Sequence, residues 1–395
     1  MRRLFVIAIA FAAALISPAQ ATVDTTAEHA ILMDADSGQV LWAKDAYTPM
    51  PPASMSKLMT LELLFQRLKD GRVKLSDKFP VSQRAWSERS GSEMFVKLGD
   101  SMTVEDLIRG IIVMSANDGC IVVAEAIGGT EENFIAMMNA RAKQLGLNQS
   151  HFVNPNGLPD PPGQLMSAAD LATLARHMIR DYPAYYHYFS ERSFVWSGIS
   201  QENRNLVLEK FPGADGLKTG HTDAAGYGIT TSAVQNGARL VLVLNGLRYP
   251  DLAKRDSKSQ DWFAEQRRAE EAARILGVAF REFRRYQLFK ADDIVGKAVV
   301  WQGDSDSVPL KLAGPLSIML PVDAQAGMKA TLKYNGPVHA PVALNQRIGT
   351  LRITAPDFPG MDVPVYAAGS VGSAGIFGRI FLGLRSLISP NSTGQ

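Results

Sequence analysis

The chain has 395 residues, of which 46% are hydrophobic and 20% are charged, and its formal net charge is +2. This composition is typical of a globular protein with a sizeable core and excludes disordered and collagen-like classes. The length predicts about two domains. The near-neutral charge argues against nucleic acid as a partner, because binding it normally requires a concentrated positive field.

The cysteine and histidine content limits the chemistry further. Cys120 is the only cysteine, which excludes an internal disulfide and a cysteine-rich zinc site. The six histidines are scattered and lack metal-binding spacings such as HExxH. No glycine-rich nucleotide-binding motif follows a predicted strand. We therefore expect neither a metal ion nor a cofactor.

The N-terminus has the pattern of a signal peptide over residues 1–21. Arg2 and Arg3 precede an apolar run at residues 4–16, and Ala-Gln-Ala at residues 19–21 fits a cleavage site. An uncleaved membrane span is the alternative, but the run is shorter than the roughly 20 residues that a bilayer requires. The twin arginine is also compatible with export of a folded chain. Cleavage would leave 39 basic and 39 acidic residues.

A predicted β-hairpin opens the mature chain and predicted helices follow it. Residues 29–45 predict two short strands around a turn at residues 36–38. Residues 54–70 are apolar nearly all round and end at Gly71, which predicts a buried helix. Capping residues and apolar runs predict three further helices, at residues 103–114, 118–127 and 167–179.

Strands return after this helical middle. Residues 217–222 and 226–247 are strand-like, with a hairpin turn at residues 236–237. A helix at residues 261–283 closes this part of the chain. Because helices separate the early strands from the late ones, we expect an α+β domain at residues 22–283, whose two ends share one antiparallel sheet.

The character of the chain changes after this domain. Residues 284–366 contain short strand-like runs separated by Gly, Pro, Asp and Asn, which predicts a small all-β domain. Residues 367–375 have the composition of a linker. The apolar side chains of residues 376–390 fall on one helical face, which predicts an amphipathic helix lying on a membrane. A terminal helix packed against its own protein is the alternative.

The segment PPASMSKLMT, at residues 51–60, places a serine and a lysine three positions apart. At helical spacing Ser54 and Lys57 share one face, with Cβ atoms about 5–6 Å apart. Apolar neighbours lower the pKa of a lysine, and a neutral amine can take the proton of a serine hydroxyl. The first turn of a helix also favours a developing oxyanion. Taken alone, the same spacing also fits an ordinary helix start.

Two further motifs make a nucleophilic site the preferred interpretation. Ser-Ala-Asn at residues 115–117 offers a hydroxyl for proton relay and an amide for a substrate amide. Lys-Thr-Gly at residues 218–220, on a predicted strand, offers a cation and a hydroxyl to a carboxylate, and its glycine lets a substrate backbone approach. The set S-x-x-K, S-x-N and K-T-G, in this order, is typical of class A β-lactamases and penicillin-binding proteins.

The motif-bearing segments resemble those of the D-alanyl-D-alanine carboxypeptidases, which are low-molecular-mass penicillin-binding proteins of the S11 serine peptidases. PPASMSKLMT, SANDGC and GLKTGHTDAAGY carry the resemblance, and NPNGLPDPPGQLMSAADL and QENRNLVL extend it. The resemblance covers essentially the whole mature chain. It implies a penicillin-binding, β-lactamase-like transpeptidase domain of α+β class, followed by a small all-β domain. It also implies a periplasmic enzyme whose C-terminal amphipathic helix attaches it to the outer face of the inner membrane.

The resemblance further implies roles for individual residues. Ser54 would be the acyl-forming nucleophile, Lys57 its general base and Ser115 a proton-transfer residue. The backbone N–H groups of Ser54 and His221 would form the oxyanion hole. The residues implied in substrate binding are Asn117, Lys218, Thr219, Gly220, His221 and Arg268.

Some positions depart from the family pattern. Arg268 has Arg255 and Arg267 as rivals for the substrate carboxylate, because residues 249–266 are an insertion before it. Ala116 replaces a glycine, and Glu93 stands where a small hydroxyl residue is common, so the loop over the site can differ. Cys120 is expected to be a small buried residue, with a reactive thiol as the alternative.

The implied reaction is removal of the terminal D-alanine from peptidoglycan stem pentapeptides, through an acyl-enzyme on Ser54 that β-lactams would also form. A DD-endopeptidase and a β-lactamase of the same fold are alternatives, as is a non-catalytic peptidoglycan-binding protein with a role in cell shape. Between Ser115 and Lys218 no E-x-x-L-N-like segment supplies a deacylating carboxylate, which argues against the β-lactamase.

Overall fold

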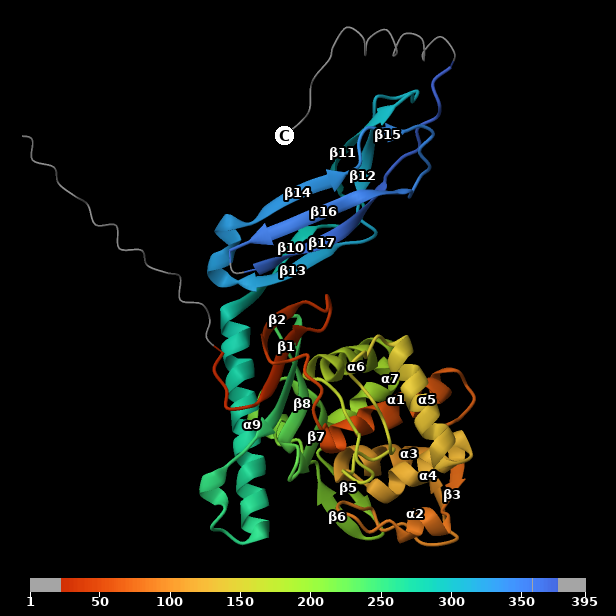
Figure 1. Ribbon diagram of the computed structural model, residues 1–395, viewed down its shortest axis with the longest axis vertical. Helices are drawn as coiled ribbons and strands as arrows, with labels where there is room; N and C mark the ends of the chain where they lie inside the picture. The colour runs from red at the N-terminus through yellow and green to blue at the C-terminus, as the bar shows by residue number, and fades with distance from the viewer. Residues whose placement is uncertain (1–22, 357, 376–395) are drawn as a thin grey trace, which may run out of the picture.

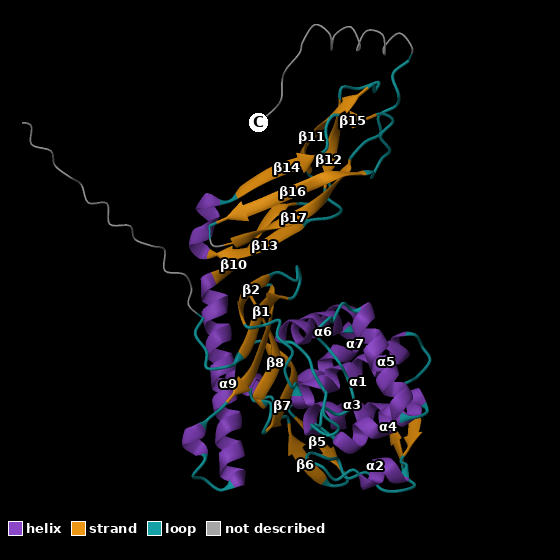
Figure 2. Ribbon diagram, viewed as in Figure 1, coloured by secondary structure: helices purple, strands orange, loops and turns teal. Residues whose placement is uncertain are grey.

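The computed structural model describes residues 23–356 and 358–375 (Figure 1). An α+β domain and a smaller all-β domain are joined at the end of the long helix α9 (Ser257–Glu282) (Figures 1 and 2). This architecture confirms the predicted fold class. The predicted signal peptide at residues 1–21 and the predicted amphipathic helix at residues 376–390 lie outside the described residues.

A five-stranded antiparallel sheet forms the centre of the α+β domain, with the strand order β2-β1-β9-β8-β7. Its strands are β1 (His29–Asp34), β2 (Val40–Lys44), β7 (Ala214–Thr222), β8 (Gly226–Gln235) and β9 (Ala238–Leu247). β1 pairs with β9 over its whole length, from His29 opposite Asn245 to Asp34 opposite Leu240. The two ends of the domain therefore share one sheet, as the order of elements predicted, and the strand β7 lies at an edge.

The sheet is covered on both faces (Figure 2). One face packs against α9 and the short α8 (Val207–Lys210). The helices on the other side of the sheet are α1 (Lys57–Lys69), α2 (Gln83–Ser87), α3 (Val104–Arg109), α4 (Asn117–Gly128), α5 (Glu131–Gln144), α6 (Ala168–Asp181) and α7 (Pro183–Tyr186).

Strand β9 shows why the sheet needs both layers. Side chains alternate between the two faces of a strand. Leu240 and Leu242 belong to the apolar core that contains Ile275 of α9, whereas Val241 and Val243 belong to the core of the helical layer. A strand buried on both faces reads as a continuous apolar run, which is the pattern of residues 240–244.

Short elements complete the α+β domain. The predicted helix at residues 103–114 is split into α3, whose N-cap Thr103 accepts a hydrogen bond from the Asp106 N–H, and a π-helical turn. The shorter elements are η1 (Ala53–Ser56), η2 (Gly110–Met114), η3 (His187–Ser190), η4 (Pro250–Leu252), β3 (Lys78–Pro80), β4 (Ser101–Thr103), β5 (Ser193–Trp196) and β6 (Ile199–Glu202).

The second domain is built of strands around its own apolar core. Six strands form a sheet in the order β14-β16-β17-β12-β11-β15, and β10 pairs with β13. The elements are β10 (Phe283–Phe289), β11 (Ile294–Trp301), β12 (Ser307–Lys311), β13 (Leu316–Pro321), η5 (Val322–Gly327), β14 (Lys329–Tyr334), β15 (Val338–His339), β16 (Arg347–Ala355) and β17 (Phe358–Ala367). None of the helices in the described part of the chain has the length and apolarity needed to cross a bilayer.

Polar contacts connect the β domain to the β1–β2 turn. Arg285 of β10 pairs with Asp36 and, across 2.5 Å, with Asp34, a carboxylate that is only 2% exposed. The side-chain amide of Gln39 both donates to and accepts from the backbone of Met319, at 2.6 and 3.2 Å. These bonds satisfy buried polar groups on both sides and fix the β domain against the sheet.

Candidate active site

Ser54 and Lys57 lie together where the chain enters α1. The predicted helix began at Ser54, but residues 53–56 form a 3-10 turn and α1 begins at Lys57. A 3-10 turn has three residues per turn, so positions i and i+3 are aligned. Lys57 Nζ is accordingly 2.8 Å from Ser54 Oγ, within hydrogen-bond distance. Ala53, just before the serine, has φ of +47°, a strained value of the kind found at functional turns.

The surroundings of the Lys57 amine lower its pKa and so favour its neutral form. Its side chain is fully buried, and this burial lowers its pKa from 10.5 to about 8, with the positive charge of Arg204 acting in the same direction. The amine also donates a hydrogen bond to the carbonyl oxygen of Asn156. A lysine with this pKa is partly unprotonated near neutral pH, so it can accept the proton of the adjacent hydroxyl.

The S-x-N segment belongs to the helical layer, and its Ser115 lines the same cavity as Ser54. Ser115 ends the π-helical turn in the left-handed region, with φ of +60° and ψ of +35°, and Asn117 begins α4. The Asn117 amide nitrogen donates to the carbonyl oxygen of Ser90, while its buried Oδ1 has no hydrogen-bond partner among the described residues. An unpaired buried acceptor is costly, so this oxygen is available to a ligand N–H group.

The K-T-G segment lies on the edge strand β7. Lys218 and Thr219 are buried, and burial lowers the pKa of Lys218 well below its usual range, with the nearby Lys57 charge adding to the effect. A Cβ atom at Gly220 would lie 2.9 Å from the carbonyl oxygen of Pro52. The glycine therefore lets β7 approach the turn that carries the serine, whereas the sequence interpretation assigned it to the approach of substrate.

His221 connects β7 to helix α9. Its ring stacks on Tyr227, with ring centroids 3.7 Å apart and an interplanar angle of 7°. The Tyr227 hydroxyl donates to Asp261 of α9 across 2.7 Å. Burial lowers the pKa of His221, which favours the neutral imidazole. The start of α9 is thus hydrogen-bonded to β8, the strand that pairs with β7.

These elements surround one cavity of about 740 Å³. Six of the nine residues proposed from sequence line it: Ser54, Ser115, Thr219, Gly220, His221 and Arg268. Lys57 reaches the cavity through its contact with Ser54, and Asn117 and Lys218 are buried residues of the elements that bound it. The structure therefore brings all three motifs, which lie far apart in sequence, to a single cleft.

The structure separates the three candidate arginines. Arg268 lines the cleft and is 2% exposed; its guanidinium donates to the Arg204 carbonyl oxygen across 3.1 Å, and its Nε has no partner among the described residues. Arg255 lies over the ring of Phe263 instead, and Arg267 pairs with Asp251 at 2.7 Å.

Sequence reasoning missed Arg204, which lines the same cleft. The segment QENRNLVL resembles a family stretch, yet the pattern gave no reason to choose this arginine. Its position becomes clear only when the loop after β6 folds over the cavity, where its charge lowers the pKa of both Lys57 and Lys218. The cleft thus holds two arginines, Arg204 and Arg268.

Two other features belong to none of the three motifs. Cys120 is fully buried, which raises its pKa to about 12, so the thiol is protonated at neutral pH.

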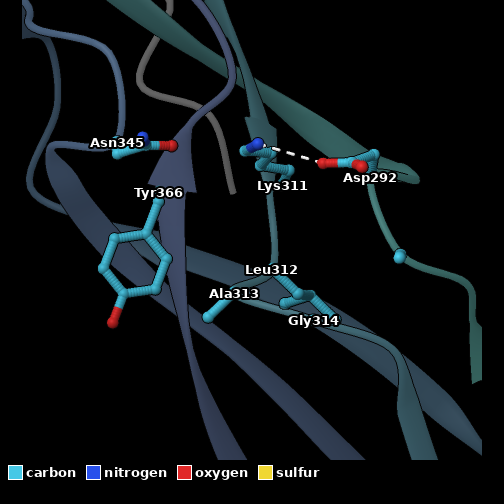
Figure 3. A pocket seen from close by; sticks show the side chains of 8 residues that line it. Asp292, Lys311, Leu312, Ala313, Gly314, Asn345 and Tyr366 are labelled. Atoms are coloured by element: carbon cyan, nitrogen blue, oxygen red, sulfur yellow. Dashed lines mark hydrogen bonds and ion pairs between the residues drawn. The ribbon is translucent and has the colours of Figure 1, made fainter.

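A hollow of about 370 Å³ in the β domain is lined by residues that include Tyr366, Lys311 and Asp292, the last two 3.0 Å apart (Figure 3). None of the residues proposed from sequence lines this hollow. The described residues contain no cluster of His, Cys, Asp and Glu suited to a metal ion.

Comparison with known proteins agrees with this geometry. The family model of D-alanyl-D-alanine carboxypeptidases matches residues 16–247, and the model of the penicillin-binding protein 5 C-terminal domain matches residues 283–373. The D-alanyl-D-alanine carboxypeptidase DacD of Salmonella typhimurium is 35% identical over 96% of this chain and 97% of its own length. DacD of Escherichia coli is 36% identical over 89% of this chain and 88% of its own length.

Solved structures give the same result. Penicillin-binding protein 5 from Haemophilus influenzae has a TM-score of 0.78 at 32% identity, over 89% of this chain and 98% of its own. Penicillin-binding protein D2 from Listeria monocytogenes, solved in a cefotaxime-bound form, has a TM-score of 0.56 at 26% identity, over 64% of this chain and 97% of its own. With its family match spanning more than half its length, the chain belongs to the D-alanyl-D-alanine carboxypeptidase family of serine peptidases.

Proposed function

We propose that this protein is a serine-type D-Ala-D-Ala carboxypeptidase that removes the terminal D-alanine from peptidoglycan stem peptides. The observation that carries the proposal is the 2.8 Å contact between Lys57 Nζ and Ser54 Oγ, because a buried amine of lowered pKa beside a hydroxyl is an activated nucleophile. Membership of the family supports the choice of substrate.

Acylation begins when the neutral Lys57 amine takes the Ser54 proton and Oγ attacks the carbonyl carbon of the penultimate residue. The backbone N–H groups of Ser54 and His221 bind the oxyanion that develops. The peptide bond then breaks, and the departing D-alanine nitrogen receives a proton through the Ser115 hydroxyl. Water hydrolyses the resulting ester, which releases the shortened peptide and restores Ser54.

Binding groups on opposite walls hold the peptide. The unpaired Oδ1 of Asn117 accepts a hydrogen bond from a substrate amide N–H, which would satisfy a buried acceptor. The terminal carboxylate meets Thr219 and the buried guanidinium of Arg268, and Lys218 and Gly220 lie on the same strand as Thr219. A charged carboxylate is thereby favoured next to the scissile bond, which suits a carboxypeptidase.

β-Lactams mimic the D-Ala-D-Ala terminus and acylate Ser54 in the same way in this proposal. Two solved structures of one relative, the cefotaxime-bound and ampicillin-bound forms of Listeria monocytogenes penicillin-binding protein D2, support β-lactams as ligands of this site. Slow hydrolysis of the adduct distinguishes the proposed inhibition from β-lactamase activity.

We also propose how the protein is located. Residues 1–21 direct export, residues 22–283 and 284–366 act as the catalytic and β domains, and residues 376–390 attach the protein to the outer face of the inner membrane. The spacing of apolar residues in the sequence of that last segment supports the attachment. Deletion of residues 376–395 should move the protein from the membrane fraction to the soluble fraction. Unchanged membrane recovery would refute the anchor.

The direct test of the proposed function is D-alanine release from diacetyl-L-lysyl-D-alanyl-D-alanine by residues 22–375. Release by this protein, and its loss in the Ser54→Ala variant, is the expected result. A well-folded protein that releases no D-alanine would overturn the proposal, and cleavage only of cross-linked peptides would favour a DD-endopeptidase.

A further inference from the structure

The first turns of α9 form an outer wall of the catalytic cleft. The residues of this helix that line the cavity are either adjacent or three positions apart, which places them on one helical face. They are Lys258, Asp261, Trp262, Glu265 and Arg268. The segment that carries most of them, residues 249–266, is the insertion identified in the sequence. This addition to the family pattern therefore faces the cavity that contains the serine.

The wall extends well past Arg268. At 1.5 Å per residue, Trp262 lies about 9 Å and Lys258 about 15 Å from Arg268 along the helix axis. An extended peptide advances about 3.3 Å per residue. If Arg268 holds the carboxylate of the departing residue, as the proposed function states, the wall offers surface that the single methyl group of alanine cannot fill.

The chemistry of this outer part differs from that of the inner cleft. Trp262 is 55% exposed, which is unusual for so large an apolar side chain. The carboxylates of Asp261 and Glu265 lie on the same helical face, and Glu202 of β6 also lines the cavity. Lys258 is the one basic residue of the outer helical wall, so acidic side chains outnumber basic ones on this wall, while Arg204 lines the cavity from the loop after β6.

Two observations beyond the acidic residues point to a ligand. Arg268 is almost completely buried and lines the cavity; the Glu265 carboxylate lies 4.0 Å from one of its terminal nitrogens, and its Nε has no hydrogen-bond partner among the described residues, so the guanidinium can bind a further carboxylate. Asp261 accepts a hydrogen bond from the Tyr227 hydroxyl at 2.7 Å, which fixes the beginning of the wall against β8, the strand next to β7. A carboxylate at Arg268 and a cation near Trp262 would match both ends of the cleft.

We propose that the outer cleft is a leaving-group subsite for a D-amino acid whose long side chain ends in an amine. The inference rests on the proposed function and specifies its substrate class. The aliphatic part of such a side chain covers the Trp262 indole, and its ammonium group faces the ring and the carboxylates of Asp261 and Glu265. The same peptide bond breaks and the same proton reaches the departing nitrogen, so only the released D-amino acid changes.

The test compares three peptides that share a diacetyl-L-lysyl-D-alanyl part and end in D-alanine, D-lysine or D-norleucine. D-Norleucine has an aliphatic side chain without the amine, so it isolates the contribution of charge. The mature chain should cleave the D-lysine peptide with a higher kcat/KM than the D-norleucine peptide. Trp262→Ala should lower kcat/KM for the D-lysine peptide about threefold to tenfold, the range expected of a cation–π contact.

Controls separate this subsite from the catalytic machinery. Trp262→Ala should change kcat/KM for the D-alanine peptide less than about twofold, since the methyl group does not reach the indole, and Trp262→Phe should retain part of the preference. Tyr47→Ala removes an aromatic side chain that is 61% exposed and does not line the cleft, so it should alter none of the three rates.

The outcomes distinguish this inference from the proposed function. Equal losses on the D-alanine and D-lysine peptides, or no loss on either, in folded Trp262→Ala would overturn the subsite and leave the carboxypeptidase intact. A protein that cleaves none of the peptides would overturn both. A preference for D-norleucine over D-lysine would show that the acidic residues do not select an amine.

Discussion

Lys57 Nζ lies 2.8 Å from Ser54 Oγ, and the lysine of this pair is fully buried while the serine lines the open cleft. Three features of the protein produce this contact. Apolar residues around Lys57 remove water from the amine, the 3-10 turn aligns positions i and i+3, and Gly220 lets the edge strand approach that turn. A nucleophile and its base are thus positioned before any substrate arrives.

Replacement of Lys57 by alanine should abolish most of the acylation without preventing folding. Removal of a positioned general base typically costs about 10²- to 10⁴-fold in rate. The rate of labelling by a fluorescent penicillin measures the effect directly, and circular dichroism checks that the variant is folded. Labelling of folded Lys57→Ala at the unaltered rate would exclude Lys57 as the base.

The pH dependence of acylation should report the Lys57 amine. Burial lowers its pKa to about 8, and only the unprotonated amine can accept a proton. The acylation rate should therefore rise about tenfold per pH unit below the pKa and level off above it, once the amine is neutral. Stopped-flow acylation between about pH 6 and pH 9.5 tests this expectation. A rate that falls with rising pH through this range would contradict the assignment.

Arg268→Ala should weaken recognition of the substrate carboxylate specifically. A hydrogen bond to a charged group contributes about 1.5–3 kcal/mol, so kcat/KM for a D-Ala-D-Ala peptide should fall about ten- to hundredfold. The same peptide with a C-terminal amide lacks the carboxylate charge and should be affected much less by the substitution.

Two arginine variants serve as comparisons for Arg268→Ala. Arg267→Ala removes an exposed guanidinium that pairs with Asp251 and should leave kcat/KM unchanged. Arg204→Ala measures the contribution of the second arginine in the cleft. Equal losses on the acid and amide substrates in Arg268→Ala would show that this arginine does not bind the carboxylate.

The contact between the domains should contribute to stability through Arg285. Its removal leaves the carboxylate of Asp34, which is 2% exposed, without its guanidinium partner. The free energy of unfolding should fall by about 1–3 kcal/mol in Arg285→Ala. Urea unfolding measures the change.

Lys311→Ala provides the control for this stability effect, because Lys311 pairs with Asp292, whose side chain is 80% exposed. Such surface pairs contribute about 0–1 kcal/mol, so this variant should remain close to the unaltered protein. If Arg285→Ala lost no more stability than Lys311→Ala, the Asp34 contact would not stabilise the protein.

Much of the fold could be predicted because local patterns mark its elements. The apolar runs, the turn at Asn236-Gly237 and the caps Thr103 and Ser167 predicted strands and helices that the structure contains, since each signal acts within a few residues. The order of these elements predicted the shared sheet. Helix α5 was not predicted, although the cap Thr130 and the buried side chains spaced four apart along it were usable signals.

The site was predictable only in part, because motifs specify residue types and not their neighbours in space. The role of Gly220 in the approach of β7 to the Ser54 turn depends on pairing between distant segments. Arg204 reaches the cleft through a loop whose path no local pattern determines. The position of Trp262 in the outer wall likewise could not be predicted without knowing the direction of α9 relative to β7. These contacts depend on the tertiary arrangement of the elements.

The most direct test of the central claim is to identify the residue that a β-lactam acylates. The mature chain is treated with a penicillin, and mass spectrometry measures the intact protein and its proteolytic peptides. The account predicts a single adduct on the peptide that contains Ser54, and no adduct in the Ser54→Ala variant. An adduct on another residue, or none on the folded protein, would contradict the assignment of Ser54 as the nucleophile.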